Sequence, residues 1–161
     1  MKRQIDRSSI ALDAVSSTLL IPLIARARGG DIYPWLDPGD VQAQHVMARF
    51  GHDVDPLLQD RTAMLNVLWR TRLMKRLAED FFQHHPASQG INLGAGLSDY
   101  FQWLNNGHNR WLDADLEGVV TLRHLLLPEH SATASDVCID LTQRGWWEQL
   151  GLNDRATREP M

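Results

Sequence analysis

The sequence is poor in cysteine and in long apolar runs. Its 161 residues include a single cysteine, Cys138, which cannot form a disulfide within the chain and therefore indicates a reducing compartment. Because Cys138 lies in an apolar run that reads as a strand, we expect it to be a small core residue rather than a nucleophile. The most apolar run near the N-terminus covers residues 18–25 and is interrupted by Pro22. A membrane-spanning helix needs ~20 apolar residues, so we expect a cytoplasmic protein with no membrane partner.

Basic charge is also scarce. The chain has 16 Lys and Arg residues against 20 Asp and Glu residues, which gives a formal net charge of −4. Nucleic-acid binding needs a basic stripe, and the sequence has none, so we expect no nucleic-acid partner. The seven histidines match no common metal-ligand spacing, and no Gly-x-Ser-x-Gly element indicates a serine hydrolase. We therefore assign neither a metal site nor a catalytic residue.

What is present is an ordinary globular composition, with 43% apolar and 22% charged residues, in a chain long enough for one compact domain. In the first half, apolar side chains recur at helical spacing, which predicts helices over residues 9–28, 40–50 and 55–84. A break near residues 60–62 would divide the third helix. One face of this helix carries Leu65, Leu68, Trp69, Leu73, Leu77 and Phe81.

The pattern changes after residue 86, where short apolar runs alternate with helical stretches. The runs at residues 91–93, 110–114 and 137–139 are expected to be strands, and the helices are expected at 99–104, 117–127 and 143–150. Three such units in a row indicate a parallel sheet with crossover helices. We therefore predict an α/β fold in one structural unit. Residues 1–86 would form a helical cap, a lid over substrate or cofactor, and residues 87–161 the start of a Rossmann-like domain.

A glycine-rich turn follows the first predicted strand. Gly94 and Gly96 flank Ala95, and Ser98 and Asp99 then supply good helix N-cap residues. Glycine has no Cβ, so a ligand can approach this backbone closely, and the following helix presents free N–H groups. The turn therefore predicts a nucleotide-like cofactor. The third glycine of the dinucleotide fingerprint falls on Asp99, which disfavours a nicotinamide dehydrogenase.

Acidic residues follow the other two predicted strands. Asp115 comes 19 residues after Gly96 (115 − 96), close to the interval of ~20 at which a carboxylate reaches a ribose in nucleotide-binding folds. Asp140 follows the third strand and could accept a hydrogen bond from an exocyclic amine. Strand ends of a parallel sheet converge, so a shared site is expected. Each aspartate is also a plausible helix N-cap, and this alternative remains open.

Four stretches of the sequence resemble a known protein family. Residues 91–97, 111–123, 140–141 and 146–147 resemble the leucine carboxyl methyltransferase family, and within it the tetracenomycin-type polyketide O-methyltransferases. The resemblance extends from about residue 15 to about residue 152. It implies a class I fold, S-adenosyl-L-methionine as cofactor and transferase activity toward a carboxyl or hydroxyl oxygen of a small-molecule methyl acceptor, polyketide-like or a carboxylate.

The resemblance also implies site residues. Arg70 would pair with the methionine carboxylate of the cofactor, Gly94 and Gly96 would cradle its methionyl and ribose parts, and Asp115 would hold the ribose hydroxyls. For Arg70 a solvated helix residue is the alternative, because other basic residues lie nearby in the sequence. The full set implied as cofactor-binding is Arg70, Gly94, Ala95, Gly96, Asp115, Leu116, Asp140 and Leu141.

The sequence departs from the family pattern at Lys75, where the family usually has an aspartate, and in two further places. Ser98-Asp99-Tyr100 stands where the family usually has Asp-Thr-Arg, and the chain stops at Met161, where a fourth strand would begin. We therefore expect the N-terminal half of the methyltransferase fold, with three strands and an open edge at the first strand. Such an edge is prone to pairing with another chain. The alternative function is a non-catalytic remnant that serves in cofactor binding or oligomerisation.

Overall fold

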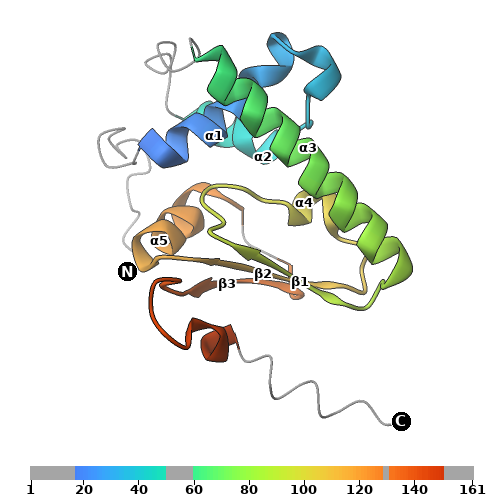
Figure 1. Ribbon diagram of the computed structural model, residues 1–161, viewed down its shortest axis with the longest axis vertical. Coiled ribbons are helices and arrows are strands. Elements are labelled where there is room, and N and C mark those ends of the chain that lie inside the picture. The colour runs from blue at the N-terminus through green and yellow to red at the C-terminus, as the bar shows by residue number, and fades with distance from the viewer. Residues whose placement is uncertain (1–16, 50–59, 129–130, 151–161) are drawn as a thin grey trace, which may run out of the picture.

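Helices fill the first half of the protein, and strands alternate with helices in the second (Figure 1). The computed structural model describes residues 17–49, 60–128 and 131–150. Three 3-10 segments cover Gly29–Asp31, Pro34–Leu36 and Trp146–Leu150. The other elements are α1 (Ser17–Arg28), α2 (Val41–Met47), α3 (Arg61–His84), β1 (Gln89–Leu93), α4 (Phe101–Leu104), β2 (Arg110–Asp115), α5 (Glu117–Leu126) and β3 (Ala134–Cys138).

The three strands form one parallel sheet in the order β1-β2-β3. Ile91 of β1 lies opposite Leu112 of β2, and Leu112 lies opposite Ser135 of β3. Within the described residues β2 is therefore the central strand and β1 an open edge. The sheet confirms the predicted α/β fold with its first three parallel strands, and it is consistent with part of a Rossmann-like methyltransferase fold.

The helices gather on one face of the sheet, as Figure 1 shows for α1 to α4. Trp111 of β2 packs against Phe82 of α3 and against Phe101 and Leu104 of α4. The apolar side of α5 joins α1 and α2 in a second buried cluster. Parallel strands that follow one another across a sheet with right-handed crossovers carry their helices on the same face, which explains this layering.

Aspartates begin two of the N-terminal helices. Asp40 accepts a hydrogen bond from the backbone N–H of Ala43 at 2.8 Å, and Asp60 accepts one from Ala63 at 2.9 Å. Each side chain thereby satisfies a donor that the first helical turn leaves without a partner. The start at Asp60 agrees with the expected break near residues 60–62. The parts of the predicted helices at 9–16 and 50–59 lie outside the described residues.

Two predictions in the C-terminal part are wrong. The α-helix expected at residues 143–150 is a short 3-10 segment, Trp146–Leu150, with no buried residue. Cys138 was expected in the core but is exposed, because β3 is an edge strand in the described sheet. Both outcomes follow from the position of this region at the border of the sheet. No helix in the described ranges is long and apolar enough to cross a membrane.

Candidate functional site

The turn after β1 depends on two glycines. Gly94 and Gly96 have φ angles of 67° and 55°, a left-handed conformation that costs other residues ~1–2 kcal/mol. The backbone N–H groups of Gly94 and Ala95 both donate to the carbonyl oxygen of Ala114, at 2.8 and 3.2 Å. The turn is therefore anchored to the end of β2.

A pocket of about 380 Å³ opens at this turn. Its walls come from α1, from α3, from residues 92–98 and from the end of β2. The volume lies within the range of ~300–1,000 Å³ found for small-molecule and cofactor sites. Five of the predicted cofactor residues line it: Arg70, Gly94, Ala95, Gly96 and Asp115. The structure therefore brings together residues that lie up to 45 positions apart in the sequence (115 − 70).

Asp115 reaches across to the glycine turn. One of its carboxylate oxygens, Oδ2, accepts a hydrogen bond from the backbone N–H of Gly96 at 2.7 Å, and Oδ1 accepts one from Leu116 at 2.8 Å. The N-cap position of α5 belongs to Leu116 and has no side-chain hydrogen bond. A carboxylate offers about four acceptor positions, so Asp115 retains acceptor capacity toward a ligand.

The other three predicted residues lie outside the pocket lining. Leu116 and Leu141 are exposed. The Asp140 carboxylate accepts hydrogen bonds from Thr142 and Gln143, which is the local turn-capping arrangement of the alternative reading. The hydrogen bonds from the hydroxyl and backbone of Thr142 lower the pKa of Asp140. A contact of these residues with adenine stays a prediction.

Arg70 is an exposed residue of α3 that lines the pocket. It makes no hydrogen bond or ion pair with the described parts of the chain. Arg72, on another side of the same helix, instead donates to the carbonyl oxygen of Trp35. The Arg70 guanidinium therefore retains all its donors for an anionic group in the pocket.

Arg123 of α5 holds the turn from the side of the sheet. Its guanidinium pairs with Asp113 at 2.6 Å and Asp136 at 2.8 Å, and all three side chains are buried. The same group donates to the carbonyl oxygens of Gly96 at 2.8 Å and Ser98 at 2.7 Å. One buried cation therefore connects β2, β3 and the glycine turn.

Asn92, which lines the pocket, extends this network. Its amide donates to Asp113 at 2.7 Å and to the Ser98 hydroxyl at 3.2 Å. Burial raises the pKa of Asp113 above its ordinary value of 3.8, while the Arg123 guanidinium and the Asn92 amide act in the opposite direction. These partners satisfy a carboxylate that would otherwise be costly to bury.

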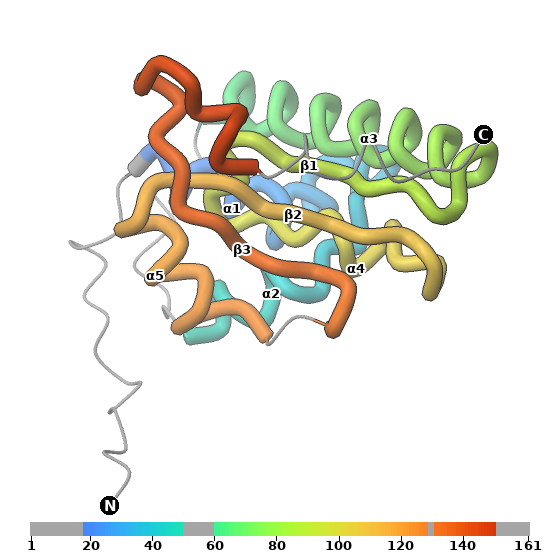
Figure 2. Tube along the Cα trace, turned by 90° about the horizontal axis from the view of Figure 1, so that it is seen from below, coloured from blue at the N-terminus to red at the C-terminus, as the bar shows by residue number. Residues whose placement is uncertain are grey.

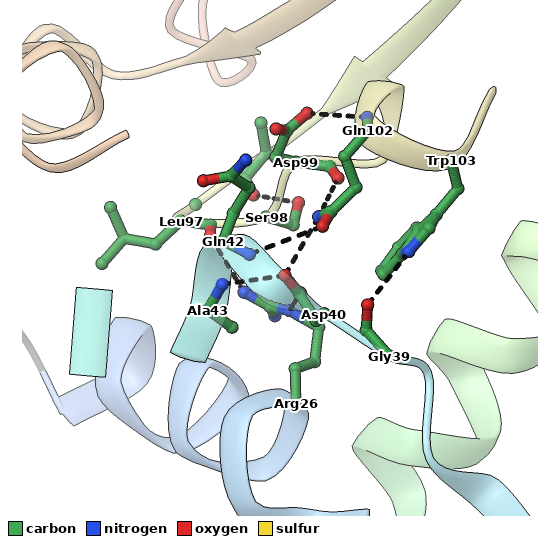
Figure 3. Close-up of polar contacts among 12 residues, drawn as sticks. Arg26, Gly39, Asp40, Gln42, Ala43, Leu97, Ser98, Asp99, Gln102 and Trp103 are labelled. Atoms are coloured by element: carbon green, nitrogen blue, oxygen red, sulfur yellow. Dashed lines mark hydrogen bonds and ion pairs between the residues drawn. The ribbon is translucent and has the colours of Figure 1, made fainter. Parts of the chain in front are cut away.

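Arg26 of α1 holds the same turn from the side of the N-terminal helices (Figure 3). Its Nε donates to Asp40 at 2.8 Å, and its second nitrogen donates to the carbonyl oxygen of Leu97 at 2.9 Å. Asp40 also accepts hydrogen bonds from the Ala43 backbone and from the side chain of Gln102. Three helices, α1, α2 and α4, are thereby joined beside the turn.

The sequence analysis did not predict the roles of the buried arginines and aspartates, although the apolar pattern around them indicated burial. Arg123 falls on the apolar face of α5 between Val120 and Leu126, and Asp113 falls inside an apolar strand. A charged residue within an apolar pattern indicates a buried ion pair, because an unpaired charge would be too costly there. The described residues contain no group of three or more His, Cys, Asp or Glu that could hold a metal ion.

The chain matches no protein-family model and no solved structure. Among curated proteins it is similar to the "Tetracenomycin polyketide synthesis O-methyltransferase TcmP" of Streptomyces glaucescens, with 31% identity over 149 residues. The match covers 92% of this chain and 54% of that protein, so the chain spans about half the length of this relative. Membership of the leucine carboxyl methyltransferase family stays a prediction. The similarity supports a relationship between this chain and the methyltransferases.

Proposed function

We propose that this chain forms the S-adenosyl-L-methionine-binding part of an O-methyltransferase. The observation that carries the proposal is a single pocket with three kinds of group on its walls: a left-handed glycine turn, the Asp115 carboxylate and the Arg70 guanidinium, which has no partner among the described residues. The cofactor has a carboxylate, ribose hydroxyls and an adenine. Arg70 suits the carboxylate and Asp115 suits the hydroxyls.

Open space beside the glycine turn also supports this cofactor. A Cβ added at Gly94 would meet no atom within 4 Å, so the backbone of the turn borders open space that a ligand can fill. When bound, the cofactor supplies an electrophilic methyl group on a sulfonium sulfur. The residues of the chain then have to orient the methyl group toward the acceptor oxygen and exclude water, which needs no covalent link to the protein.

We further propose that the methyl acceptor is a small molecule with a carboxyl or hydroxyl oxygen. The name of the Streptomyces relative supports this choice, because it describes an O-methyltransferase of polyketide synthesis. The apolar wall of the pocket supports it as well, since Leu19, Pro22 and Met74 offer contacts to a hydrophobic ligand rather than to a charged one.

Isothermal titration with S-adenosylhomocysteine tests the proposal directly. We expect Asp115→Ala to weaken binding at least about tenfold, because a desolvated hydrogen bond to a carboxylate contributes ~1.5–3 kcal/mol. Asp80→Ala is the control, since Asp80 is an exposed aspartate of α3. Absence of binding to folded wild-type protein, or equal affinities for the two variants, would contradict the proposal.

Arg70→Ala is the sharper variant because Arg70 has no partner in the described structure whose loss could disturb the fold. We expect its affinity for S-adenosylhomocysteine to fall about tenfold with the unfolding midpoint unchanged. Arg76→Ala removes an exposed arginine from the same helix, outside the pocket lining, and serves as the matched control. If both variants bind equally well, Arg70 is the solvated helix residue of the alternative reading.

A further inference from the structure

Three consecutive carbonyl groups of the glycine turn are held by two buried arginines. Arg123 donates to the oxygens of Gly96 and Ser98, and Arg26 donates to the oxygen of Leu97 between them. The two guanidinium groups come from helices 97 positions apart in the sequence (123 − 26). Arg26 is 5% exposed and Arg123 is 1% exposed, so neither is a solvated surface contact.

Burying these two charges is costly, and each is compensated by acidic partners. Arg26 pairs with Asp40, and Arg123 pairs with Asp113 and Asp136, all of them through nitrogen to oxygen distances of 2.6–2.8 Å. A hydrophobic pair of similar volume often stabilises a fold as well as a buried ion pair does. The feature that a hydrophobic pair could not reproduce is the set of hydrogen bonds to the turn.

Those hydrogen bonds fix the direction of the peptide planes. Each peptide is planar, and no cis peptide occurs in the described chain, so the N–H of a residue points opposite to the preceding carbonyl. Holding the carbonyls of residues 96–98 therefore sets the directions of the next three N–H groups. Gly94 and Gly96 have no side chain that could add such rigidity.

We propose that Arg26 and Arg123 are positioning residues for the cofactor turn. They come from two different helices, α1 in the N-terminal half and α5 after β2, and they keep the turn in its ligand-competent conformation. The apparent dissociation constant of a ligand increases in proportion as the competent fraction of the protein falls. The identity of the ligand in this inference rests on the proposed function. The effect of the two arginines on the conformation of the turn does not depend on any ligand.

Lysine is the informative substitution at residue 26. The Nε of Arg26 donates a hydrogen bond to the Asp40 carboxylate, and a terminal nitrogen donates one to the carbonyl oxygen of Leu97. Two nitrogens of one planar group thus contact two different acceptors. A lysine ammonium keeps the charge and the ion pair but is a single point that cannot reproduce this fork. Arg26→Lys should therefore release the turn while retaining most of the buried electrostatics.

The first measurement is hydrogen–deuterium exchange without ligand, on the full chain. We expect Arg26→Lys to accelerate exchange about tenfold in peptides that cover residues 92–100, with β2 and α5 unchanged. Arg28→Lys is the matched control, because Arg28 lies on the same helix and its side chain is 48% exposed beside an exposed Asp31. A purely structural role predicts faster exchange in every segment, and that result, or unchanged exchange in the turn, would overturn the proposal.

The second measurement is the affinity for S-adenosylhomocysteine of variants that urea unfolding shows to be folded. We expect Arg26→Lys to bind about tenfold more weakly and Arg28→Lys to bind as the wild type does. Arg123→Lys is the second variant and should give the same local exchange pattern. If the wild-type protein does not bind S-adenosylhomocysteine, the proposed function fails, and the exchange measurement still tests the positioning role.

Global unfolding of both Arg26→Lys and Arg123→Lys, or an unchanged affinity of Arg26→Lys, contradicts the positioning role.

Discussion

The two sides of the glycine turn differ in how their groups are satisfied. On the inner side, the turn carbonyls and the buried charges of Arg26 and Arg123 all have partners. On the outer side, where α3 runs alongside β1 (Figure 2), large apolar side chains are exposed. They are Trp69, Leu73, Met74, Leu77 and Phe81. The turn is therefore held on its inner side, whereas its outer side is uncovered within the described residues.

The two neighbouring strands show the same difference. In β2, residues 111–114 are all buried, whereas no residue of β1 is buried and Leu93 at its end is exposed. A parallel sheet is normally covered on both faces and paired at both edges of its central strands. Within the described residues, the edge of β1 and the apolar side chains of α3 are therefore both left uncovered.

The largest effect is expected from the inner side. Arg123→Met would leave Asp113 and Asp136 buried without their cation, and breaking a buried pair in this way costs ~3–5 kcal/mol. Arg76→Met changes an exposed arginine on the outer side and should alter the free energy of unfolding by less than ~0.5 kcal/mol. Urea unfolding of both variants measures the contrast. A similar loss in both would remove the distinction between the two sides.

The next prediction compares two leucines of α3. Leu68 is 0% exposed and packs against α1, whereas Leu77 is 57% exposed on the outer side. We expect Leu68→Ala to destabilise the fold by ~2–5 kcal/mol through loss of packing and a residual cavity. Leu77→Ala should change the unfolding free energy by ~0.5 kcal/mol or less. A large loss in Leu77→Ala would mean that the outer side of α3 is covered in solution.

A smaller contrast separates two glycines. A Cβ at Gly94 or Gly118 meets no atom within 4 Å, but only Gly94 has a positive φ. Gly94→Ala should cost ~1–2 kcal/mol from backbone strain alone. Gly118→Ala, within α5, should instead stabilise the protein by up to ~1 kcal/mol. Thermal unfolding of the two variants measures both signs, and a stabilised Gly94→Ala would show that the turn does not need its left-handed backbone.

The sequence predicted the sheet and the turn because their signals are local. Short apolar runs between helical stretches predicted the three strands. The spacing of Gly96 and Asp115 predicted that the two lie at one site, and the structure joins them by a hydrogen bond of 2.7 Å. The burial of α3 could not be predicted in the same way. The predicted apolar face is divided in the structure. Leu68 is buried together with Met64, Val67 and Phe82, whereas Trp69, Leu73 and Leu77 are exposed. Periodicity identifies an apolar face but not which neighbour will cover it.

Long-range contacts set the other limit. The hydrogen bond from Arg26 to Leu97 joins residues 71 positions apart, and no motif spans that distance. Arg26 lies within the stretch that the resemblance covers, yet its role depends on where α1 lies after folding. The three predicted residues Leu116, Asp140 and Leu141 follow strands as expected but do not line this pocket. The backbones of neighbouring strands end close together, which the sequence pattern predicts. The direction of each side chain depends on local hydrogen bonds, such as the one from Thr142 to Asp140, which the pattern does not predict.

The smallest effect on stability is expected from charges added to the outer side, beside the open β1 edge that is prone to pairing with another chain. Leu73→Lys combined with Leu77→Lys should leave the unfolding free energy within ~0.5 kcal/mol of the wild type. The double variant should nevertheless reduce concentration-dependent self-association in sedimentation velocity, because like charges beside an open edge disfavour pairing.

The control is the double variant Gln44→Lys with His45→Lys, which adds the same side chains to an exposed part of α2. If the control reduces association equally, net charge is the cause. If the wild type stays monomeric at every concentration, the expected edge pairing is wrong, and the outer side is open to ligand alone.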